Sequence, residues 1–281
     1  MTRFKLSFLL LSGIIMLTSF YPVSGQQLLN KYLDNLDPTI KLSFIIQDQE
    51  GEVLSKLNAD KKSPSASIIK IPLLIYFMKN VEEGLISLND SYQLKSSDKV
   101  GGSGELQFKP SGFSVTYEYL AKEMIRVSDN TATNIIIRRL GLKPFQDWLK
   151  AKGYIHTQLN RYMMDFEAIE KGQQNYLSPK EMNRLLLTLY DGDLLTKTSS
   201  LKVINYLKNC EDNRALPHQI PDGVAIAHKT GTLDYVRGDA GIIFGKKPIF
   251  ITVLVENFSE IPEADSIIST IGKLAYLEFS R

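Results

Sequence analysis

Three short motifs follow one another along the 281-residue chain, and each contains residue types used in acyl transfer. They are Ser67-Ile-Ile-Lys70, Ser128-Asp129-Asn130 and Lys229-Thr230-Gly231. A serine hydroxyl is a weak nucleophile that needs an adjacent base, and a lysine buried near other cations can lose its proton near neutral pH. Together the motifs predict a site where a serine is acylated and a lysine moves its proton.

The first motif is not distinctive alone, because a serine three residues before a lysine also occurs at Ser96 and Ser199. Ser67 differs because it opens the apolar run 68–78, which predicts a buried helix. Residues three apart share a helix face, so Lys70 is a candidate base for Ser67, and the helix start favours negative charge there. Ser96 and Ser199 lie in polar stretches that predict solvated turns or a helix start. Without the other two motifs, Ser67 would be interpreted as an N-cap residue.

The second motif, 128–130, lies between helical patterns at 116–126 and 131–140. A short loop between two helices can present side chains rigidly into a cleft. Alone, this tripeptide is also an ordinary helix N-cap.

The third motif follows residues 224–227, a short apolar run typical of a strand. Lys229 would then stand on a strand edge beside Gly231, where a ligand can approach the backbone closely. Each of the three motifs is a weak signal alone, but their occurrence in this order is a strong indication of an acyl-transfer site.

With this triplet the chain resembles the class A β-lactamase-type serine hydrolases, within the β-lactamase and penicillin-binding protein superfamily. The similarity runs from the N-terminal strands to the final helix. Further matches are Gly101-Gly102-Ser103-Gly104, His228 and Arg237-Gly238-Asp239-Ala240-Gly241.

The resemblance implies how the reaction is divided among four residues. Ser67 would be the acylated nucleophile, Lys70 its base, and Ser128 the group that passes a proton to the leaving nitrogen. The backbone N–H groups of Ser67 and Thr232 would form the oxyanion hole.

The resemblance also implies which residues bind substrate. Asn130 would hydrogen-bond the amide side chain of the substrate, while Lys229 and Thr230 would hold its carboxylate, with Thr232 beside them. Asp129 is expected to be a structural brace.

One departure from the family pattern concerns the second half of the reaction. Class A enzymes carry a glutamate shortly after an arginine, and this glutamate activates the water for deacylation. Counted from Arg161, that position holds Met163, and counted back from Pro179 the loop is one residue short. The deacylating base is therefore missing or is supplied by Asp165 or Glu167, and we rank Asp165 first because it lies closest to the expected position. A surface carboxylate on an acidic loop is the alternative interpretation of Asp165.

The N-terminal residues 1–25 have the features of a secretory signal peptide. Arg3 and Lys5 precede an apolar stretch, and cleavage is expected near Gly25. This predicts a secreted or periplasmic protein without a stable membrane anchor, since no cysteine follows the stretch for lipid attachment. Cys210 is the only cysteine, so no internal disulfide can form.

Composition argues against several other functions. A formal charge of +2, without a clustered basic stripe, gives no support for nucleic-acid binding. His156, His218 and His228 are scattered without metal-ligand spacing, so neither a metal site nor a cofactor is expected. Ser103 lacks the second glycine of the GxSxG nucleophile elbow, and we interpret it as part of a loop.

The expected fold belongs to the α/β class, of the α+β type found in β-lactamases and transpeptidases. Strands and helices flank a helical middle, which predicts an antiparallel sheet lobe, at about 26–60 and 209–281, with an all-helical lobe inserted at about 61–208. The substrate cleft should lie at their junction. The elements expected are a helix at 27–36, strands at 42–46 and 53–57, a hairpin of 241–244 with 249–255, and a helix at 264–279.

Three functions fit these observations. The favoured one is a serine hydrolase that forms an acyl-enzyme with a β-lactam and hydrolyses it. The second keeps the acylation machinery but acts on peptidoglycan-derived D-Ala-D-Ala peptides or on other amides and esters, with slow β-lactam turnover. The third, a catalytically inactive binding module, is disfavoured by the intact Ser67, Lys70, Ser128 and Lys229.

Overall fold

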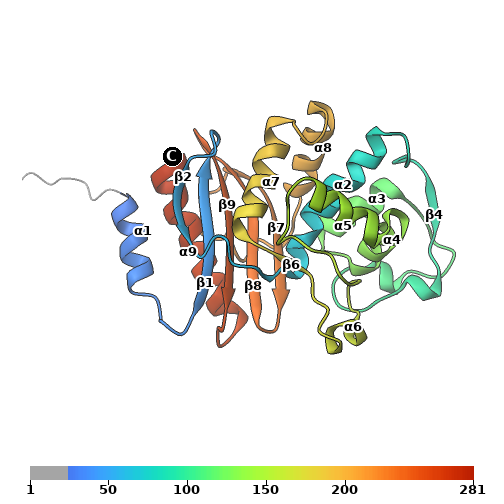
Figure 1. The fold of residues 1–281 in the computed structure, drawn as a ribbon, viewed down its shortest axis with the longest axis horizontal. Helices are drawn as coiled ribbons and strands as arrows, with labels where there is room; N and C mark the ends of the chain where they lie inside the picture. The colour runs from blue at the N-terminus through green and yellow to red at the C-terminus, as the bar shows by residue number, and fades with distance from the viewer. Residues whose placement is uncertain (1–24) are drawn as a thin grey trace, which may run out of the picture.

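A five-stranded antiparallel sheet forms one half of the molecule, and it joins segments from the beginning and the end of the described chain (Figure 1). The computed structural model describes residues 25–281, so the predicted signal peptide lies outside the described residues except for Gly25. The strand order is β2-β1-β9-β8-β7, and β1 pairs with β9 along its whole length. The strands are β1 (Lys41–Asp48), β2 (Val53–Leu57), β7 (Ala225–Leu233), β8 (Val236–Phe244) and β9 (Pro248–Glu256). The predicted sheet lobe, with contributions from both ends, is confirmed.

The central strands are buried because helices cover both faces of the sheet. Helices α1 (Gly25–Asp34) and α9 (Ile261–Ala275, followed by a π-helical turn at Tyr276–Ser280) pack on one face. Helix α7 (Pro179–Asp191) lies on the other face, where Asn183 Nδ2 donates to the Phe250 carbonyl at 2.9 Å. A strand covered on both faces carries a nearly continuous apolar run, as β9 does. Helix α7 thus belongs with the sheet, although its sequence lies in the range predicted for the helical lobe.

The third motif lies on an edge strand, as predicted, but its hairpin partner is longer than expected. Strand β7 has only β8 as a neighbour, and β8 begins at Val236, five residues before the expected strand. The first half of this strand cannot be recognised in the sequence, because it contains two charged residues and a glycine instead of an apolar run (Arg237, Gly238 and Asp239).

The other half of the molecule is built from helices around α2 (Lys70–Glu82). The remaining helices are α3 (Tyr117–Arg126), α4 (Asn130–Leu140), α5 (Leu142–Ala151), α6 (Phe166–Glu170) and α8 (Lys197–Leu207). Short 3-10 turns occur at Ala66–Ile69 (η1), Ser96–Asp98 (η2) and Leu106–Phe108 (η3). Two small ladders complete the structure, β3 (Ser63–Pro64) with β6 (Tyr176–Leu177) and β4 (Ser91–Gln93) with β5 (Ser114–Thr116). Within residues 25–281, no helix has the length and apolar character needed to span a membrane.

The two rejected serine–lysine pairs lie where the sequence predicts. Ser96 is exposed in the η2 turn, and Ser199 lies in the first turn of α8, where its N–H is capped by the Thr196 hydroxyl. Neither serine lines the cavity described below.

Candidate active site

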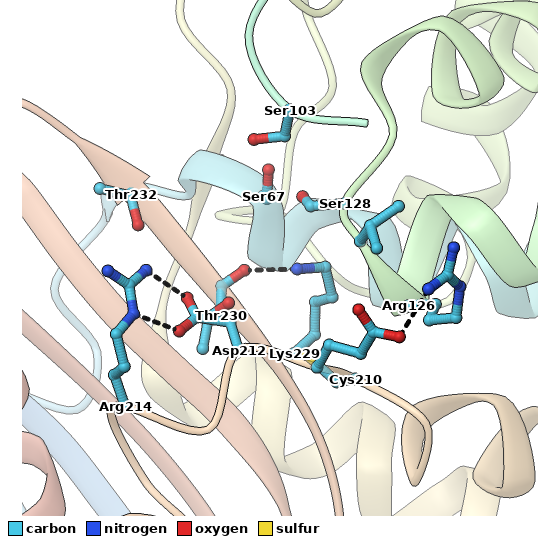
Figure 2. Close-up of a pocket in the computed structure, with 12 residues that line it drawn as sticks. Ser67, Ser103, Arg126, Ser128, Cys210, Asp212, Arg214, Lys229, Thr230 and Thr232 are labelled. Carbon is cyan, nitrogen blue, oxygen red and sulfur yellow. Dashed lines mark hydrogen bonds and ion pairs between the residues drawn. The ribbon is translucent and has the colours of Figure 1, made fainter. Parts of the chain in front are cut away.

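A cavity of about 590 Å³ lies where η1, the start of α4 and strand β7 meet. Five of the predicted residues line it, and they come from all three motifs: Ser67, Ser128, Lys229, Thr230 and Thr232. In Figure 2 the hydroxyls of Ser67 and Ser128 face the same space, with the Lys229 side chain near them. The fold therefore brings together side chains that are separated by up to 165 positions, the distance from Ser67 to Thr232.

Ser67 is positioned by the tight packing of η1 against β7. The expected α-helix begins at Lys70, so Ser67 itself lies in the preceding 3-10 turn, which is a small correction to the prediction. A Cβ atom on Gly231 would lie 2.9 Å from the Ala66 Cβ and 3.0 Å from the Ser65 carbonyl oxygen. Gly231 is therefore needed for this approach, which brings Ser67 and Thr232 to the same cavity.

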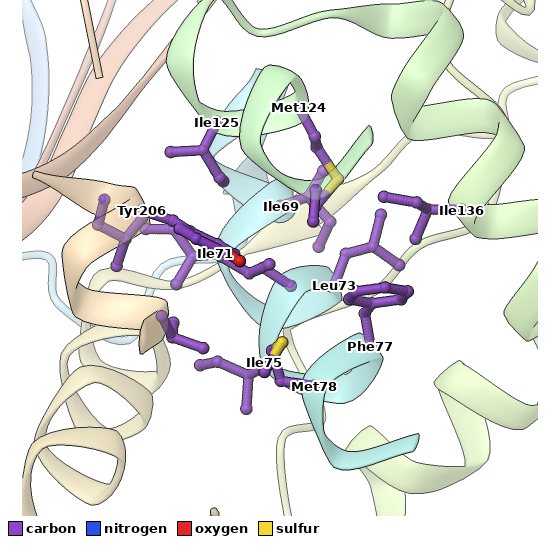
Figure 3. Close-up of a cluster of buried hydrophobic side chains, with 14 of the residues drawn as sticks. Ile69, Ile71, Leu73, Ile75, Phe77, Met78, Met124, Ile125, Ile136 and Tyr206 are labelled. Atoms are coloured by element: carbon purple, nitrogen blue, oxygen red, sulfur yellow. The ribbon is translucent and has the colours of Figure 1, made fainter. Parts of the chain in front are cut away.

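Lys70 is completely buried, with no exposed surface, at the start of α2. The rest of α2 contributes buried apolar side chains, such as Ile71, Leu73 and Phe77, to the core (Figure 3). Burial in this environment, reinforced by the nearby charge of Lys229, lowers the pKa of the Lys70 amine well below its ordinary value of 10.5. Its Nζ lies within hydrogen-bond distance of Ser128 Oγ (2.9 Å), the Ser128 carbonyl (2.7 Å) and Asn130 Oδ1 (3.0 Å).

Lys229 is the second buried amine of the site, with 1% of its surface exposed. Its Nζ donates to the Thr230 carbonyl at 2.9 Å, and burial lowers its pKa from the ordinary value. Lys229 nevertheless lines the cavity, whereas Lys70 lies behind the lining residues. Of the two amines, Lys229 is thus the one directly available to an anionic ligand.

The second motif connects the cavity to the helical lobe. Ser128 has a φ of +57°, an uncommon conformation for a residue with a side chain. Asp129 caps α4 by accepting from the Ala132 N–H at 2.8 Å, and its other oxygen accepts from the Leu106 N–H at 2.9 Å. Asp129 is therefore the brace that the sequence predicts. The Asn130 amide donates to the Gly101 carbonyl at 3.2 Å while its oxygen faces Lys70.

A chain of ion pairs that begins at the buried Arg237 and ends at the surface supports the Thr232 side of the cavity, and sequence reasoning missed it. Arg237 is fully buried and donates to Thr232 Oγ1 at 2.7 Å and to Asp265 at 2.6 Å. It also pairs with Asp212 at 3.0 Å, and Asp212 in turn pairs with Arg214. Partial burial opposes the charge of Asp212, but both arginines favour the carboxylate and hold its pKa below its ordinary value. In the sequence, the only signal for these ion pairs is the motif that begins at Arg237. The spacing of Asp212 and Asp265 does not indicate that they pair with Arg237.

The loop that carries the family's deacylating glutamate is held by side-chain-to-backbone hydrogen bonds. The Met163 N–H donates to Asn134 Oδ1 at 2.8 Å, and Asn134 Nδ2 donates back to the Met163 carbonyl at 3.0 Å. Arg161 donates from Nη2 to Gln174 Oε1 at 2.7 Å across the loop. The Met163 side chain is buried, so an apolar group stands near the position that the resemblance gives to the glutamate.

The two candidate carboxylates in this loop serve local structure. Asp165 is half-buried and caps α6, with Oδ1 accepting from the Ala168 N–H at 3.0 Å. Glu167 is exposed and pairs with Lys171 at 2.5 Å. Neither residue lines the cavity that contains Ser67, so the role of Asp165 remains a prediction. Within residues 25–281, no cluster of three or more His, Cys, Asp or Glu side chains is arranged to hold a metal ion.

Ser67, Ser128 and Lys229 line one cavity, and the buried Lys70 lies 2.9 Å from Ser128 Oγ, an arrangement that fits a serine acyl-transfer site. Comparisons with known proteins identify the family. The model of the beta-lactamase enzyme family matches residues 26–279, and the chain belongs to this family. The predicted resemblance and fold are thereby confirmed, and the protein is a class A β-lactamase-like serine hydrolase.

Individual relatives agree with this assignment over most of the chain. Beta-lactamase VEB-1 of Pseudomonas aeruginosa is 25% identical, covering 94% of this chain and 95% of the relative. The solved beta-lactamase of Sphaerobacter thermophilus is 28% identical, with a TM-score of 0.80, and covers 84% of this chain and 90% of its own. The structure of PBP-A is 27% identical, with a TM-score of 0.82 and coverage of 91% and 95%.

Proposed function

We propose that the protein hydrolyses β-lactams through an acyl-enzyme formed at Ser67. The observation that carries the proposal is the completely buried Lys70, which lies 2.9 Å from Ser128 Oγ and whose burial lowers its pKa. A neutral amine can accept the Ser67 proton, whereas an ordinary surface lysine is protonated at neutral pH. Membership in the beta-lactamase enzyme family supports the same reaction.

In the acylation step, Ser67 Oγ attacks the carbonyl carbon of the lactam while its proton moves to Lys70. The negative charge that develops on the carbonyl oxygen would be stabilised by the backbone N–H groups of Ser67 and Thr232, two residues that line the same cavity. The ring C–N bond then breaks, and the nitrogen needs a proton. Ser128 Oγ lies 2.9 Å from Lys70 Nζ, so it is placed to pass that proton on.

Substrate orientation is assigned to the β7 side of the cavity. Lys229, with Thr230 and Thr232 beside it, would bind the carboxylate of the substrate, and burial makes such a charge-assisted contact stronger than it is in water. Asn130 would donate from its amide to the acyl side chain of the substrate. Its amide currently donates to the Gly101 carbonyl at 3.2 Å, a contact that a substrate amide could replace.

Deacylation is assigned to Asp165, supported by its position in the loop and its partial burial. Glu167 is a weaker candidate, because it is exposed and paired with Lys171. Only one Asp165 oxygen is used in capping α6, so the other remains available to a water. The cap also holds the Asp165 carboxylate at the start of α6, outside the lining of the cavity that contains Ser67. We therefore expect deacylation to be slower than acylation.

The nucleophile can be tested by mass spectrometry of the protein after exposure to benzylpenicillin. We expect one covalent adduct on the peptide that contains Ser67, and none in Ser67→Ala. Ser103→Ala is the matched control, because Ser103 lines the same cavity and should leave the Ser67 adduct in place. An adduct that survives in Ser67→Ala, or one found at Ser96 or Ser199, would refute the assignment.

A further inference from the structure

A side-chain hydrogen bond joins two parts of the molecule that lie beside the cavity, the loop at residues 161–175 and the β7–β8 hairpin. Gln174 Nε2 donates to the Tyr235 hydroxyl at 2.9 Å. Tyr235 lies in the two-residue turn between β7 and β8, with 51% of its surface exposed, whereas Gln174 is buried in the loop. The acylation and binding roles described above do not use either residue.

The neighbours of Gln174 fix the orientation of its amide. Gln174 Oε1 accepts from Arg161 Nε at 3.1 Å, from Arg161 Nη2 at 2.7 Å and from the Asn175 N–H at 2.9 Å. A guanidinium and a backbone N–H can only donate, so the oxygen must face them. The amide nitrogen is therefore left for Tyr235, and the Tyr235 hydroxyl is its acceptor.

The base of the loop is also joined to the segment that carries the nucleophile. Asn175 Oδ1 accepts from the Asn160 N–H at 2.8 Å and from the Arg161 N–H at 3.1 Å, which closes the loop. The Asn175 carbonyl accepts from the Ser65 N–H at 2.9 Å, and Ser65 lies two residues before Ser67. The two ends of the loop are thus held next to η1 as one unit.

The hairpin gives the loop a second, rigid attachment point. Thr232 lines the cavity and pairs with Arg237 across the hairpin, and the Arg237 guanidinium donates to Thr232 Oγ1 at 2.7 Å. Tyr235 follows Thr232 by only three residues, and a two-residue hairpin turn leaves the backbone little freedom. The Tyr235 hydroxyl is therefore held in place relative to the cavity wall.

We propose that Gln174 and Tyr235 are positioning residues for deacylation, because their hydrogen bond fixes loop 161–175 relative to the cavity wall at Thr232. The proposal rests on the proposed function, which assigns deacylation to Asp165 in this loop. Neither Gln174 nor Tyr235 lines the cavity, so both act through the loop and not on the substrate.

This role predicts different effects on the two halves of the reaction. Acylation is assigned to Ser67, Lys70 and Ser128, and the Gln174–Tyr235 bond contacts none of them. Loss of the bond should therefore slow the breakdown of the acyl-enzyme and leave its formation nearly unchanged. A general loss of folded structure would slow both steps.

Tyr235→Phe removes only the hydroxyl, at an exposed position where the fold should tolerate the change. We expect deacylation of the benzylpenicillin adduct to slow about three- to tenfold, the scale of one neutral hydrogen bond, with acylation changed less than about twofold. Mass spectrometry of quenched samples follows both steps. Tyr190→Phe is the matched control, because Tyr190 is a partly exposed tyrosine that packs on Phe250 of the sheet. Equal slowing of both steps, unchanged deacylation, or a wild-type adduct that never decays would overturn the proposal.

Substitutions at Gln174 test the same bond from the loop side. Gln174→Met removes it and should slow deacylation at least as much as Tyr235→Phe. Gln174→Glu should restore deacylation to near the wild-type rate, because a carboxylate still accepts from Arg161 and the Tyr235 hydroxyl can donate to it. The double variant Gln174→Met with Tyr235→Phe should equal Gln174→Met alone, since the bond is already lost. Multiplying losses in the double variant would contradict a shared contact.

Hydrogen exchange of the protein without substrate separates this proposal from the proposed function. In Tyr235→Phe the amides of loop 161–175 should exchange at least about threefold faster than in wild type, while those of α2 stay unchanged. Unchanged exchange in the loop would overturn the positioning role even if Ser67 is acylated. Faster exchange in the loop without any Ser67 adduct in wild type would instead reject the proposed function and confirm that the bond holds the loop.

Discussion

The acylation site and loop 161–175 are built in different ways. On the acylation side, Lys70 and Lys229 are buried, and Lys70 contacts two residues of another motif. In loop 161–175, Asp165 caps α6, and Glu167 pairs with Lys171 just after this short helix. The amines thus have pKa values shifted by burial, whereas the carboxylates serve local capping and pairing. The contacts of the described residues therefore support formation of the acyl-enzyme more than they support its hydrolysis.

The largest effect is expected from Lys70→Ala, which removes the buried amine. The acylation rate should fall by about 10²- to 10⁴-fold, the range for loss of a general base. Stopped-flow acylation with a chromogenic cephalosporin measures it. Lys79→Ala is the matched control, since Lys79 lies on the same helix and pairs with Glu83 at its far end. Equal losses in both variants would show a fold effect rather than loss of a base.

The pH dependence of acylation sharpens this prediction. Because the pKa of Lys70 is lowered, the neutral base exists at pH values well below 10.5, and it is lost as pH falls through the lowered pKa. The wild-type rate should therefore rise with pH and level off before pH 10.5. A rate that continues to rise up to that pH would mean that Lys70 titrates as an ordinary lysine.

An effect of intermediate size is expected from Asp165→Asn, which tests loop 161–175. If Asp165 activates the water, the variant should give a burst of product followed by turnover about 10²-fold slower than wild type, with the burst rate little changed. Asparagine retains an oxygen that can cap α6, so the loop should remain in place.

Glu167→Gln is the matched control for Asp165→Asn, since Glu167 is exposed two positions further along the chain, in the first turn of α6. It should turn over like wild type. Slow turnover in Glu167→Gln with normal turnover in Asp165→Asn would exchange their roles. If wild type itself gives a burst and then stalls, and Asp165→Asn changes nothing, the loop lacks a working base.

The smallest effect is expected from Lys229→Ala, and it should depend on the substrate. Substrates with a carboxylate should lose roughly 10- to 100-fold in kcat/KM, the scale of one charge-assisted hydrogen bond. Esters without that carboxylate should change much less. Lys246→Ala, at an exposed hairpin position, is the control. Equal losses on both kinds of substrate would refute a carboxylate-binding role.

Much of the fold could be predicted from sequence, because its signals are local. The strand at 53–57 matches β2 in both limits, and the helical patterns on either side of Ser128 correspond to α3 and α4. The edge position of β7 also follows the prediction. These elements carry apolar periodicity or caps, which a sequence displays directly.

What the sequence did not predict depends on contacts between distant residues. The approach of Arg237 to Asp212 and Asp265 is created only when β8 packs with α9 and with the segment that follows α8. The depth at which Lys229 lies is likewise set by the neighbours of β7, because spacing alone suggests an exposed edge residue. Charge pairing across the fold leaves no periodic pattern, so the structure was needed to find it.

The pairing of β1 with β9 has a consequence for how the chain acquires activity. The position of Lys229 on β7 depends on three strand pairings: β7 with β8, β8 with β9, and β9 with β1. The last pairing joins strands that are more than two hundred residues apart in sequence. Closing so long a loop costs entropy before its contacts form, so the sheet should be completed late in folding. Covalent labelling of Ser67 by a penicillin during refolding would then measure the rate at which the sheet is completed.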